Sequence, residues 1–431
     1  MSGTSRTLIT LAAGLAVGAM ICGPAAAGVV SATIVAAVGD PAGGSTISSV
    51  NSPFTDGNGR VGFVAALADA RRMIWYDTGP VFFSDQALPL VLTGGEGTMG
   101  VSNTGGFVYS PSADGNDAVY THNGLLLARQ QDAPGFPGQF NSFNSRPRMT
   151  APGTAWWIAG VANTPTGSSV NRVLYRADGA QPANIQRVLA GGDVIGGFTI
   201  LTTASNFDFD ISDNNAHHIH VLDTTEASAS NQFLYVDGAM LFREGTPTGS
   251  GGNWIAFDTP GINNSGNYIF SGDTDLATTM DMFLAYNGTI MVREGDTIDG
   301  YTIASGSAVR AASINNNDMV AYIWGTGTNE ALFAGPGPTL ATSSLLLLQT
   351  GDVVDTDGDS IPDWQVFDFK ASGGIGPGLD IAQNGFVFVE VGLGPIGGTE
   401  TMEAIIRVAI PEPASASLLM LAALMLRRRR R

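Results

Sequence analysis

A nine-residue unit recurs along the chain and constrains the fold more than any other feature. The clearest copies are INNSGNYIF (262–270), INNNDMVAY (314–322) and IAQNGFVFV (381–389). Each copy has a polar turn, usually Gly or Asn at its fifth position, and a large apolar residue at its ninth. Four weaker copies bring the total to seven units, spaced by about 54 residues, which indicates a repeat architecture. The ninth residues are Phe63, Tyr109, Trp157, Ile219, Phe270, Tyr322 and Val389.

A second element follows the copies and has the pattern of a β-hairpin. Asn287-Gly288, Asp237-Gly238 and Asn123-Gly124 separate apolar segments. Such dipeptides favour two-residue turns because both residues accept positive φ. The segments GGFTIL (196–201) and DGYTIA (299–304) suggest a third strand. One unit then holds about four short strands, the content of one propeller blade.

The two ends of the repeat region complement each other. TIVAAVGD (33–40) matches the second half of the hairpin TIMVREGD (289–296), whereas EAIIRVA (403–409) matches a first half. Pairing of these ends completes one shared blade and removes two exposed sheet edges. The sequence therefore predicts an all-β fold, a seven-bladed β-propeller over residues 28–410 closed by its N- and C-terminal strands. The alternative is an open β-repeat solenoid, whose coils are usually much shorter than these units.

The large ninth residues are interpreted as core. One recurs at an equivalent place in each unit, and a buried aromatic side chain removes roughly 150–250 Å² from water. They are therefore expected to pack between blades rather than to form a binding stripe.

The N-terminus has the pattern of a secretory signal peptide over residues 1–27. Arg6 precedes an apolar stretch from Leu8 to Ile21, and small residues end at Ala27. A lipoprotein signal is the alternative, but Ile21 is large for the position before Cys22. Because Cys22 is the only cysteine, a chain cleaved after Ala27 has neither disulfides nor a thiolate nucleophile.

The charge of the repeat region excludes one class of partner. Without residues 1–27 and 411–431, the chain retains 14 basic and 37 acidic residues. Such a surface repels phosphate backbones, so no nucleic-acid partner is expected. It suits a secreted protein that stays soluble and collects cations.

The C-terminal 22 residues combine three features in order. Pro411, Glu412 and Pro413 precede an apolar run from Ala414 to Leu426, and an arginine cluster ends the chain. The cluster comprises Arg427, Arg428, Arg429, Arg430 and Arg431. The apolar run partitions into a membrane, and the arginines favour its cytoplasmic side.

This ending resembles the PEP-CTERM sorting signal of exported proteins from Gram-negative bacteria that make extracellular polysaccharide. The resemblance implies transient insertion in the inner membrane, processing by an exosortase-type enzyme, and delivery to the cell surface or beyond it. A simple C-terminal membrane anchor is the alternative. The repeat region also resembles uncharacterised exported proteins with tandem N-x-x-G-x-x-A-F repeats, matched by Asn263, Gly266 and Phe270, with Asp318 where Gly is expected.

An aspartate-rich segment, DTDGDSIPDW (355–364), predicts a calcium site. Asp355, Asp357, Asp359 and Asp363 occupy positions 1, 3, 5 and 9 of a calcium-type loop. The segment resembles the calcium loops of thrombospondin type 3 repeats, although Val366 stands at position 12 where a bidentate carboxylate is expected. The alternative is a solvated acidic turn.

Three histidines form a second cluster. On a strand, His218 and His220 face one way and His217 the other. Two imidazoles can begin a zinc or copper site, but the spacing fixes no third ligand. Packing between blades or surface exposure is the simpler expectation.

These features favour a non-catalytic surface or matrix protein whose partners are extracellular polysaccharide or other envelope components. No G-x-S-x-G, H-E-x-x-H or Walker-type sequence occurs. The alternative is an extracellular carbohydrate-active enzyme, a glycoside hydrolase or lyase, on the same ring. Four or more convergent carboxylate or aromatic side chains at one mouth of the central channel would favour the enzyme.

Overall fold

The computed structural model describes residues 29–411, except for 89, 114–115, 133–137, 144–146, 164–168, 204–205, 328 and 371–377. The predicted signal peptide and residues 412–431 of the predicted sorting signal therefore lie outside the described residues. Pro411 is described and exposed. None of the helices in the described part of the chain is long and apolar enough to cross a membrane.

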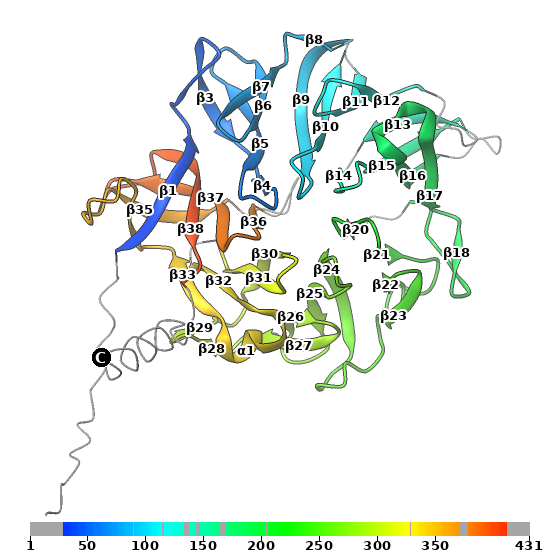
Figure 1. Ribbon diagram of the computed structural model, residues 1–431. Coiled ribbons are helices and arrows are strands. Elements are labelled where there is room, and N and C mark those ends of the chain that lie inside the picture. The colour runs from blue at the N-terminus through cyan, green and yellow to red at the C-terminus, as the bar shows by residue number, and fades with distance from the viewer. Residues whose placement is uncertain are drawn as a thin grey trace, which may run out of the picture.

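Seven sheets of four to six strands surround a common centre (Figure 1). We number these seven sheets in chain order, with the sheet that contains both terminal strands as sheet 7. Sheets 4, 5 and 6 are four-stranded antiparallel meanders. Sheet 4 contains β20 (Phe207–Ile211), β21 (His218–Asp223), β22 (Gln232–Val236) and β23 (Ala239–Arg243). Sheet 5 contains β24 (Trp254–Ile262), β25 (Tyr268–Thr274), β26 (Met282–Tyr286) and β27 (Thr289–Arg293). Sheet 6 contains β30 (Ala308–Ile314), β31 (Met319–Gly325), β32 (Glu330–Pro336) and β33 (Leu345–Gln349).

Sheets 1 to 3 follow the same order with additional short strands. Sheet 1 contains β2 (Pro41–Ala42), β3 (Ser45–Val50), β4 (Phe54–Thr55), β5 (Val61–Leu67), β6 (Arg72–Tyr76) and β7 (Gly79–Phe83). Sheet 2 contains β8 (Ala87–Leu88), β9 (Leu90–Val101), β10 (Phe107–Ala113), β11 (Asn116–Thr121) and β12 (Leu126–Arg129). Sheet 3 contains β13 (Gln139–Phe143), β14 (Arg148–Met149), β15 (Ala155–Ala162), β16 (Val170–Ala177) and β17 (Ile185–Ala190).

Sheet 7 joins the two ends of the repeat region. Its strands are β34 (Val353–Asp355), β35 (Trp364–Phe369), β36 (Leu379–Ile381), β37 (Phe386–Gly394), β38 (Met402–Ala409) and β1 (Val30–Ala37). Strands β1 and β38 are antiparallel, and Thr33 is in register with Arg407. The predicted all-β propeller closed by its terminal strands is therefore confirmed, and the open solenoid is excluded.

Short hairpins link some of the sheets. β18 (Val194–Ile195) pairs with β19 (Phe198–Thr199), and β28 (Thr297–Ile298) pairs with β29 (Tyr301–Thr302). The prediction that 196–201 and 299–304 supply a third blade strand is wrong, because these segments form separate two-stranded ladders. Four short helices complete the described structure: η1 (Asp178–Ala180), η2 (Pro182–Asn184), η3 (Gly337–Thr339) and α1 (Leu340–Ser343).

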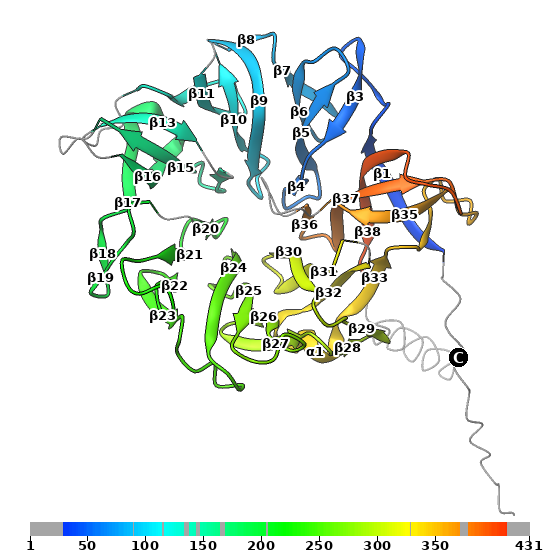
Figure 2. The same ribbon diagram turned by 180° about the vertical axis from the view of Figure 1, so that it is seen from behind.

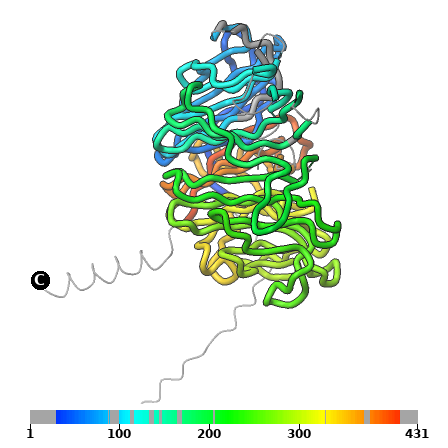
Figure 3. The backbone as a smooth tube through the Cα atoms, turned by 90° about the vertical axis from the view of Figure 1, so that its right-hand side faces the viewer, coloured from blue at the N-terminus to red at the C-terminus, as the bar shows by residue number. Residues whose placement is uncertain are grey.

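The hydrophobic core is divided into clusters between successive sheets. Val221 of sheet 4 shares a cluster with Trp254 of sheet 5, and Tyr322 of sheet 6 shares one with Ile269 of sheet 5. Phe63 of sheet 1 meets Ile405 of sheet 7, so the packing also closes the ring. Figures 2 and 3 show the ring from behind and edge-on, as a disc of sheets.

All seven ninth residues of the repeat lie on the strand that directly follows the polar turn of their unit, and none exposes more than 1% of its surface. Their predicted role in packing is confirmed. Two of the three predicted hairpin turns also have the expected geometry, with φ of 51° and 78° at Asp237-Gly238 and 48° and 79° at Asn287-Gly288. The turn at Asn123-Gly124 differs, because only Gly124 has positive φ and residues 122–125, rather than two residues, separate β11 from β12.

Candidate functional site

The polar turns of the seven units lie at one end of the ring and share one local structure. Each joins two consecutive strands of one sheet, such as β4 and β5 in sheet 1 or β36 and β37 in sheet 7, and the fifth position of each unit has a left-handed backbone with φ between 59° and 87°. These residues are Gly59, Gly105, Gly153, Asn215, Gly266, Asp318 and Gly385. Glycine, asparagine and aspartate tolerate this conformation best, which explains the choice at the fifth position.

The second position of each unit is buried and, in six of seven units, polar. The residues are Asp56, Ser102, Thr150, Ser212, Asn263, Asn315 and Ala382. Asn263 Oδ1 accepts hydrogen bonds from the backbone N–H of Ser265 and Asn267, at 3.0 and 3.1 Å. Such a side chain satisfies backbone donors inside the turn, as Asn and Asp commonly do.

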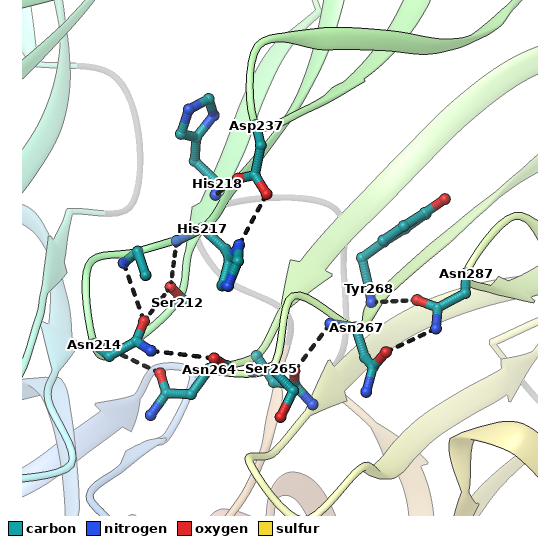
Figure 4. Close-up of polar contacts among 12 residues, drawn as sticks. Ser212, Asn214, His217, His218, Asp237, Asn264, Ser265, Asn267, Tyr268 and Asn287 are labelled. Carbon is teal, nitrogen blue, oxygen red and sulfur yellow. Dashed lines mark hydrogen bonds and ion pairs between the residues drawn. The ribbon is translucent and has the colours of Figure 1, made fainter.

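Hydrogen bonds also connect the turns of different sheets. The backbone N–H of Asn214 donates to Asn264 Oδ1 at 2.7 Å, and the Asn214 amide donates to Asn264 O at 3.1 Å (Figure 4). Comparable bonds join most neighbouring turns, and we call the set the turn ring. They link Asn384 with Asn58, Gly57 with Asn103, Ala151 with Asp213, Asn264 with Asn316, and Asn316 with Gln383.

A cavity of about 110 Å³ lies inside the turn ring, and four aspartates line it. They are Asp56, Asp210, Asp213 and Asp380. Four carboxylates are enough to meet the criterion given above for a carbohydrate-active enzyme, which is four or more convergent carboxylate or aromatic side chains. Their hydrogen bonds, however, are directed at the surrounding chain.

Asp210 connects three sheets. Its Oδ1 lies 2.7 Å from Nε of Arg148 on sheet 3, and its Oδ2 accepts the backbone N–H of Ile262 on sheet 5 at 3.0 Å. Burial raises the pKa of Asp210, while the Arg148 guanidinium opposes this rise. Removing one partner of such a buried pair leaves an uncompensated charge.

Asp380 has the same role on the opposite side of the cavity. It accepts hydrogen bonds from Thr55 N of sheet 1 at 2.8 Å and from Ser313 Oγ of sheet 6 at 2.7 Å. Burial raises the pKa of this carboxyl group too. Asp213 accepts the backbone N–H of Asn103 at 2.8 Å, and Asp56 accepts Arg60 Nε at 2.6 Å and Tyr76 OH at 2.9 Å.

Two further aspartates are exposed on the strands of sheets 4 and 5 that lie nearest the centre of the ring (Figure 1). Asp208 of β20 and Asp258 of β24 belong to adjacent sheets. Both carboxylates reach solvent but have protein on most sides. This partial burial, with Asp208 and Asp273 nearby, raises the pKa of Asp258 to about 6. Burial also raises the pKa of Asp208, which Arg172 partly offsets.

The predicted calcium loop connects β34 and β35 in the closing sheet. Carboxylate oxygens of Asp355, Asp357 and Asp363 lie within 4.8 Å of one another, so three of the four predicted ligands converge. Asp359 is not in this group, and its Oδ1 accepts the N–H of Ile361 at 2.7 Å. Val366, at position 12, is buried in the core.

The histidine cluster is arranged as the strand periodicity predicted. His220 Nε2 and His218 Nδ1 are 2.9 Å apart, whereas His217 Nδ1 contacts Asp237 Oδ2 at 2.8 Å. Burial lowers the pKa of His220 to about 3. Among the described residues, these histidines belong to no convergent group of three metal-binding side chains.

Sequence reasoning did not find Arg148, Asp210 or Asp380. All three stand immediately before the first residue of a unit, at 149, 211 and 381. Aligning the units one residue further upstream reveals this position, but its occupants differ from sheet to sheet, so no repeated residue type marks it.

The fold defines this chain as a β-propeller protein. No family model and no curated protein matches it. Similar solved structures include prolyl oligopeptidase B from Galerina marginata, at 12% identity over 85% of this chain and 52% of that one, with a TM-score of 0.44. The chain thus spans about half the length of that peptidase.

Two further similar structures are also enzymes. Polysaccharide lyase Uly1 is 9% identical, over 82% of this chain and 85% of the other, with a TM-score of 0.43. The GH93 α-L-arabinofuranosidase of Fusarium graminearum is 10% identical, over 87% and 97%, with a TM-score of 0.35. Similarities at this level do not bear on activity.

Proposed function

We propose that this chain is an exported, non-catalytic β-propeller that acts at the cell surface or in the extracellular matrix of a Gram-negative bacterium. Its partners are extracellular polysaccharide or other envelope components. An exosortase-type enzyme processes its C-terminal segment during transient insertion in the inner membrane. The sequences of residues 1–27 and 411–431 support this route.

One observation carries the non-catalytic assignment. Asp56, Asp210 and Asp380 accept hydrogen bonds or ion-pair contacts from the chain at both carboxylate oxygens, and Asp213 accepts one at Oδ1. Asp210 and Asp380 each connect three sheets. A catalytic carboxylate must have an oxygen free for the substrate or for a water molecule. A cavity of about 110 Å³ is also well below the size of most ligand sites, which occupy roughly 300–1,000 Å³.

A specific observation favours the competing function. Asp258 is exposed, its pKa is raised to about 6, and a second carboxyl group, Asp208, lies near it. Carboxyl pairs whose surroundings alter their pKa values serve as acid and base in glycoside hydrolysis. A carbohydrate-active enzyme on this ring would therefore use Asp208 and Asp258.

A glycan array combined with a hydrolase and lyase screen separates the two functions. The non-catalytic proposal expects glycan or envelope binding without turnover, and equal behaviour of the wild type and Asp258→Asn. Turnover that Asp258→Asn abolishes, while folding is retained, would establish the enzyme instead. Asp299→Asn serves as a control at a linking hairpin remote from the innermost strands.

Sorting is tested in cells. Replacing the five terminal arginines with glutamine should cause retention of the unprocessed chain or its mislocalisation, whereas replacing Arg407 in β38 should not alter processing. Normal processing and release of the arginine-free chain would contradict the proposed signal.

We also propose that Asp355, Asp357 and Asp363 hold Ca²⁺. Calcium prefers six to eight oxygen ligands, which carboxylates, backbone carbonyls and water supply. Because the three carboxylates face one another, a divalent cation would relieve their repulsion. The fourth predicted ligand, Asp359, lies outside this group of three carboxylates.

A further inference from the structure

A second cavity, of about 280 Å³, opens between sheets 2 and 3 at the end of the ring that carries the polar turns. We call it the rim pocket. Its walls come from the turns after β9 and β11 of sheet 2, and from the turn after β14 and the η1 segment of sheet 3. Figure 1 shows these two sheets side by side.

The rim pocket lies where the turn ring changes its pattern. Asn103 of sheet 2 bonds to Asp213 of sheet 4, at 2.8 Å, rather than to the adjacent turn of sheet 3. Ala151 of sheet 3 likewise bonds to Asp213. Within the described part of the chain, no hydrogen bond connects the turns 102–106 and 149–153 to each other. The two turns are therefore separate here, and the pocket occupies the space between them.

The lining of the pocket combines polar and apolar groups, and His122 supplies an imidazole. No described residue that lines it is an aspartate, glutamate, lysine or arginine. Hydroxyl and amide groups come from Ser102, Thr104, Thr121, Asn123, Thr150 and Gln181. Leu125, Met149 and Ala180 supply apolar atoms.

Several of these polar groups have hydrogen-bonding capacity left. The His122 ring nitrogens, Asn123 Nδ2 and Gln181 Oε1 make no hydrogen bond to another residue in the described ranges, and all three side chains are exposed. The His122 ring also lies against buried Phe107, with centroids 5.7 Å apart. Its ring nitrogens are therefore available to hydrogen-bond to a ligand.

Charge and size restrict the ligand. The chain has a net charge of −18, so an anionic ligand would be repelled and would find no basic partner in the lining. A cation would find no carboxylate. The volume is slightly below the usual range of roughly 300–1,000 Å³ for small-molecule sites, and thus suits one ring better than an extended oligomer.

We propose that the rim pocket binds one neutral sugar unit, with its hydroxyl groups bonded to His122, Asn123 and Gln181 and its apolar face against Leu125 and Met149. This assignment deepens the proposed function, on which it rests, by naming the site and the ligand class. A neutral residue at the end or at a branch of a polysaccharide has the required chemistry.

Titration calorimetry of the full chain with methyl glycosides of neutral hexoses tests the proposal. At least one neutral glycoside should bind, and glucuronate should not. His122→Ala and Gln181→Leu should each weaken binding by about fivefold or more, the effect of losing one hydrogen bond. Gln186→Leu is the matched control, because Gln186 is also an exposed glutamine and lies on β17, outside the pocket.

Three results would overturn the assignment: no binding of any neutral glycoside, preference for the charged sugar, or equal affinity of His122→Ala, Gln181→Leu and the wild type. The proposed function fails separately. If the glycan array detects polysaccharide binding that the pocket variants retain, the surface role stands and only the rim pocket is wrong.

Discussion

The Asn263 amide donates a 2.6 Å hydrogen bond to Oδ1 of Asp318 on the neighbouring sheet. The Asn267 amide reaches the same oxygen at 2.8 Å. Asp318 occupies the fifth position of its repeat, where the other six units have Gly or Asn, and its φ is 59°. The aspartate at this position therefore differs from the repeat pattern, and its carboxylate joins sheet 6 to sheet 5 through these two hydrogen bonds.

Asp318→Gly should destabilise the protein by about 2–5 kcal/mol. The substitution removes two hydrogen bonds to a carboxylate, each worth roughly 1.5–3 kcal/mol, and recovers only about 1 kcal/mol from the relaxed left-handed backbone. Chemical denaturation measures the difference. Asp318→Asn, which keeps the acceptor and tolerates the backbone, should lose less than half as much. Equal or greater stability of Asp318→Gly would contradict a role in holding the sheets together.

The elements that sequence reasoning predicted well are those that every unit needs for its own backbone conformation and packing. A left-handed fifth residue is required in every polar turn, and a buried ninth residue is required on the strand that follows it, so both recur as residue types. The closing of the ring was equally visible, because the halves at 33–40 and 403–409 each lack a strand that the other supplies.

The central cavity could not be predicted in the same way. Arg148, Asp210 and Asp380 come from sheets 3, 4 and 7, and only the closed ring brings them together. The side chains that bond across the interfaces between sheets differ from one sheet to the next, so they do not recur with the period of the repeat. The linking hairpins were misassigned for a related reason. Phe198–Thr199 and Tyr301–Thr302 have strand-like residues, but each pairs with the two-residue strand directly before it rather than with a strand of a blade.

A disulfide between the terminal strands should stabilise the ring. Thr33 and Arg407 are register partners, and Arg407 Nη2 lies 3.4 Å from Thr33 Oγ1, so the two side chains share a face. The double variant Thr33→Cys/Arg407→Cys should form an intramolecular bond under oxidising conditions and raise the melting temperature. Chain-entropy reasoning sets an upper limit of about 6 kcal/mol for so long a loop, with less expected where strain intervenes.

Mass spectrometry and melting curves with and without reductant check this outcome. Cys22 is the only native cysteine, so it is replaced by Ser in all variants. Each single-cysteine variant should melt at the same temperature with and without reductant. Failure of the double variant to cross-link would argue against the pairing of β1 with β38 in solution.

Glu390 on β37 should make stability fall as the pH rises. Burial, with Glu403 and Asp368 nearby and Lys370 opposing them, raises the pKa of Glu390 to about 8 from an ordinary 4.5. The folded state favours the protonated form of Glu390. Its contribution to the free energy of unfolding is therefore complete below pH 4.5 and is lost as the pH rises through about 8. Glu390→Gln stays neutral and should become the more stable protein at alkaline pH, by on the order of 2–4 kcal/mol.

Urea denaturation of both proteins between about pH 5 and pH 9 measures this difference. Glu400→Gln is the control, since Glu400 is a partly exposed partner of Lys370 at 2.8 Å, and such pairs contribute up to about 1 kcal/mol. A gap between wild type and Glu390→Gln that does not change with pH would show that Glu390 is ionised at an ordinary pKa.

Calcium should raise the melting temperature through the closing sheet. The loop 355–363 replaces the tight turn of the other linking hairpins, such as Asp299-Gly300, and Asp355 is a register partner of Ser31 on β1. An ion held there fixes β34 beside the N-terminal strand, and any ligand that binds only the folded state stabilises it by mass action. Asp357→Asn and Asp363→Asn should each lose most of the shift in millimolar calcium. Asp359→Asn should keep it, because Asp359 lies outside the group of converging carboxylates. Absence of a shift in the wild type, or its loss in Asp359→Asn alone, would contradict the proposed ligand set.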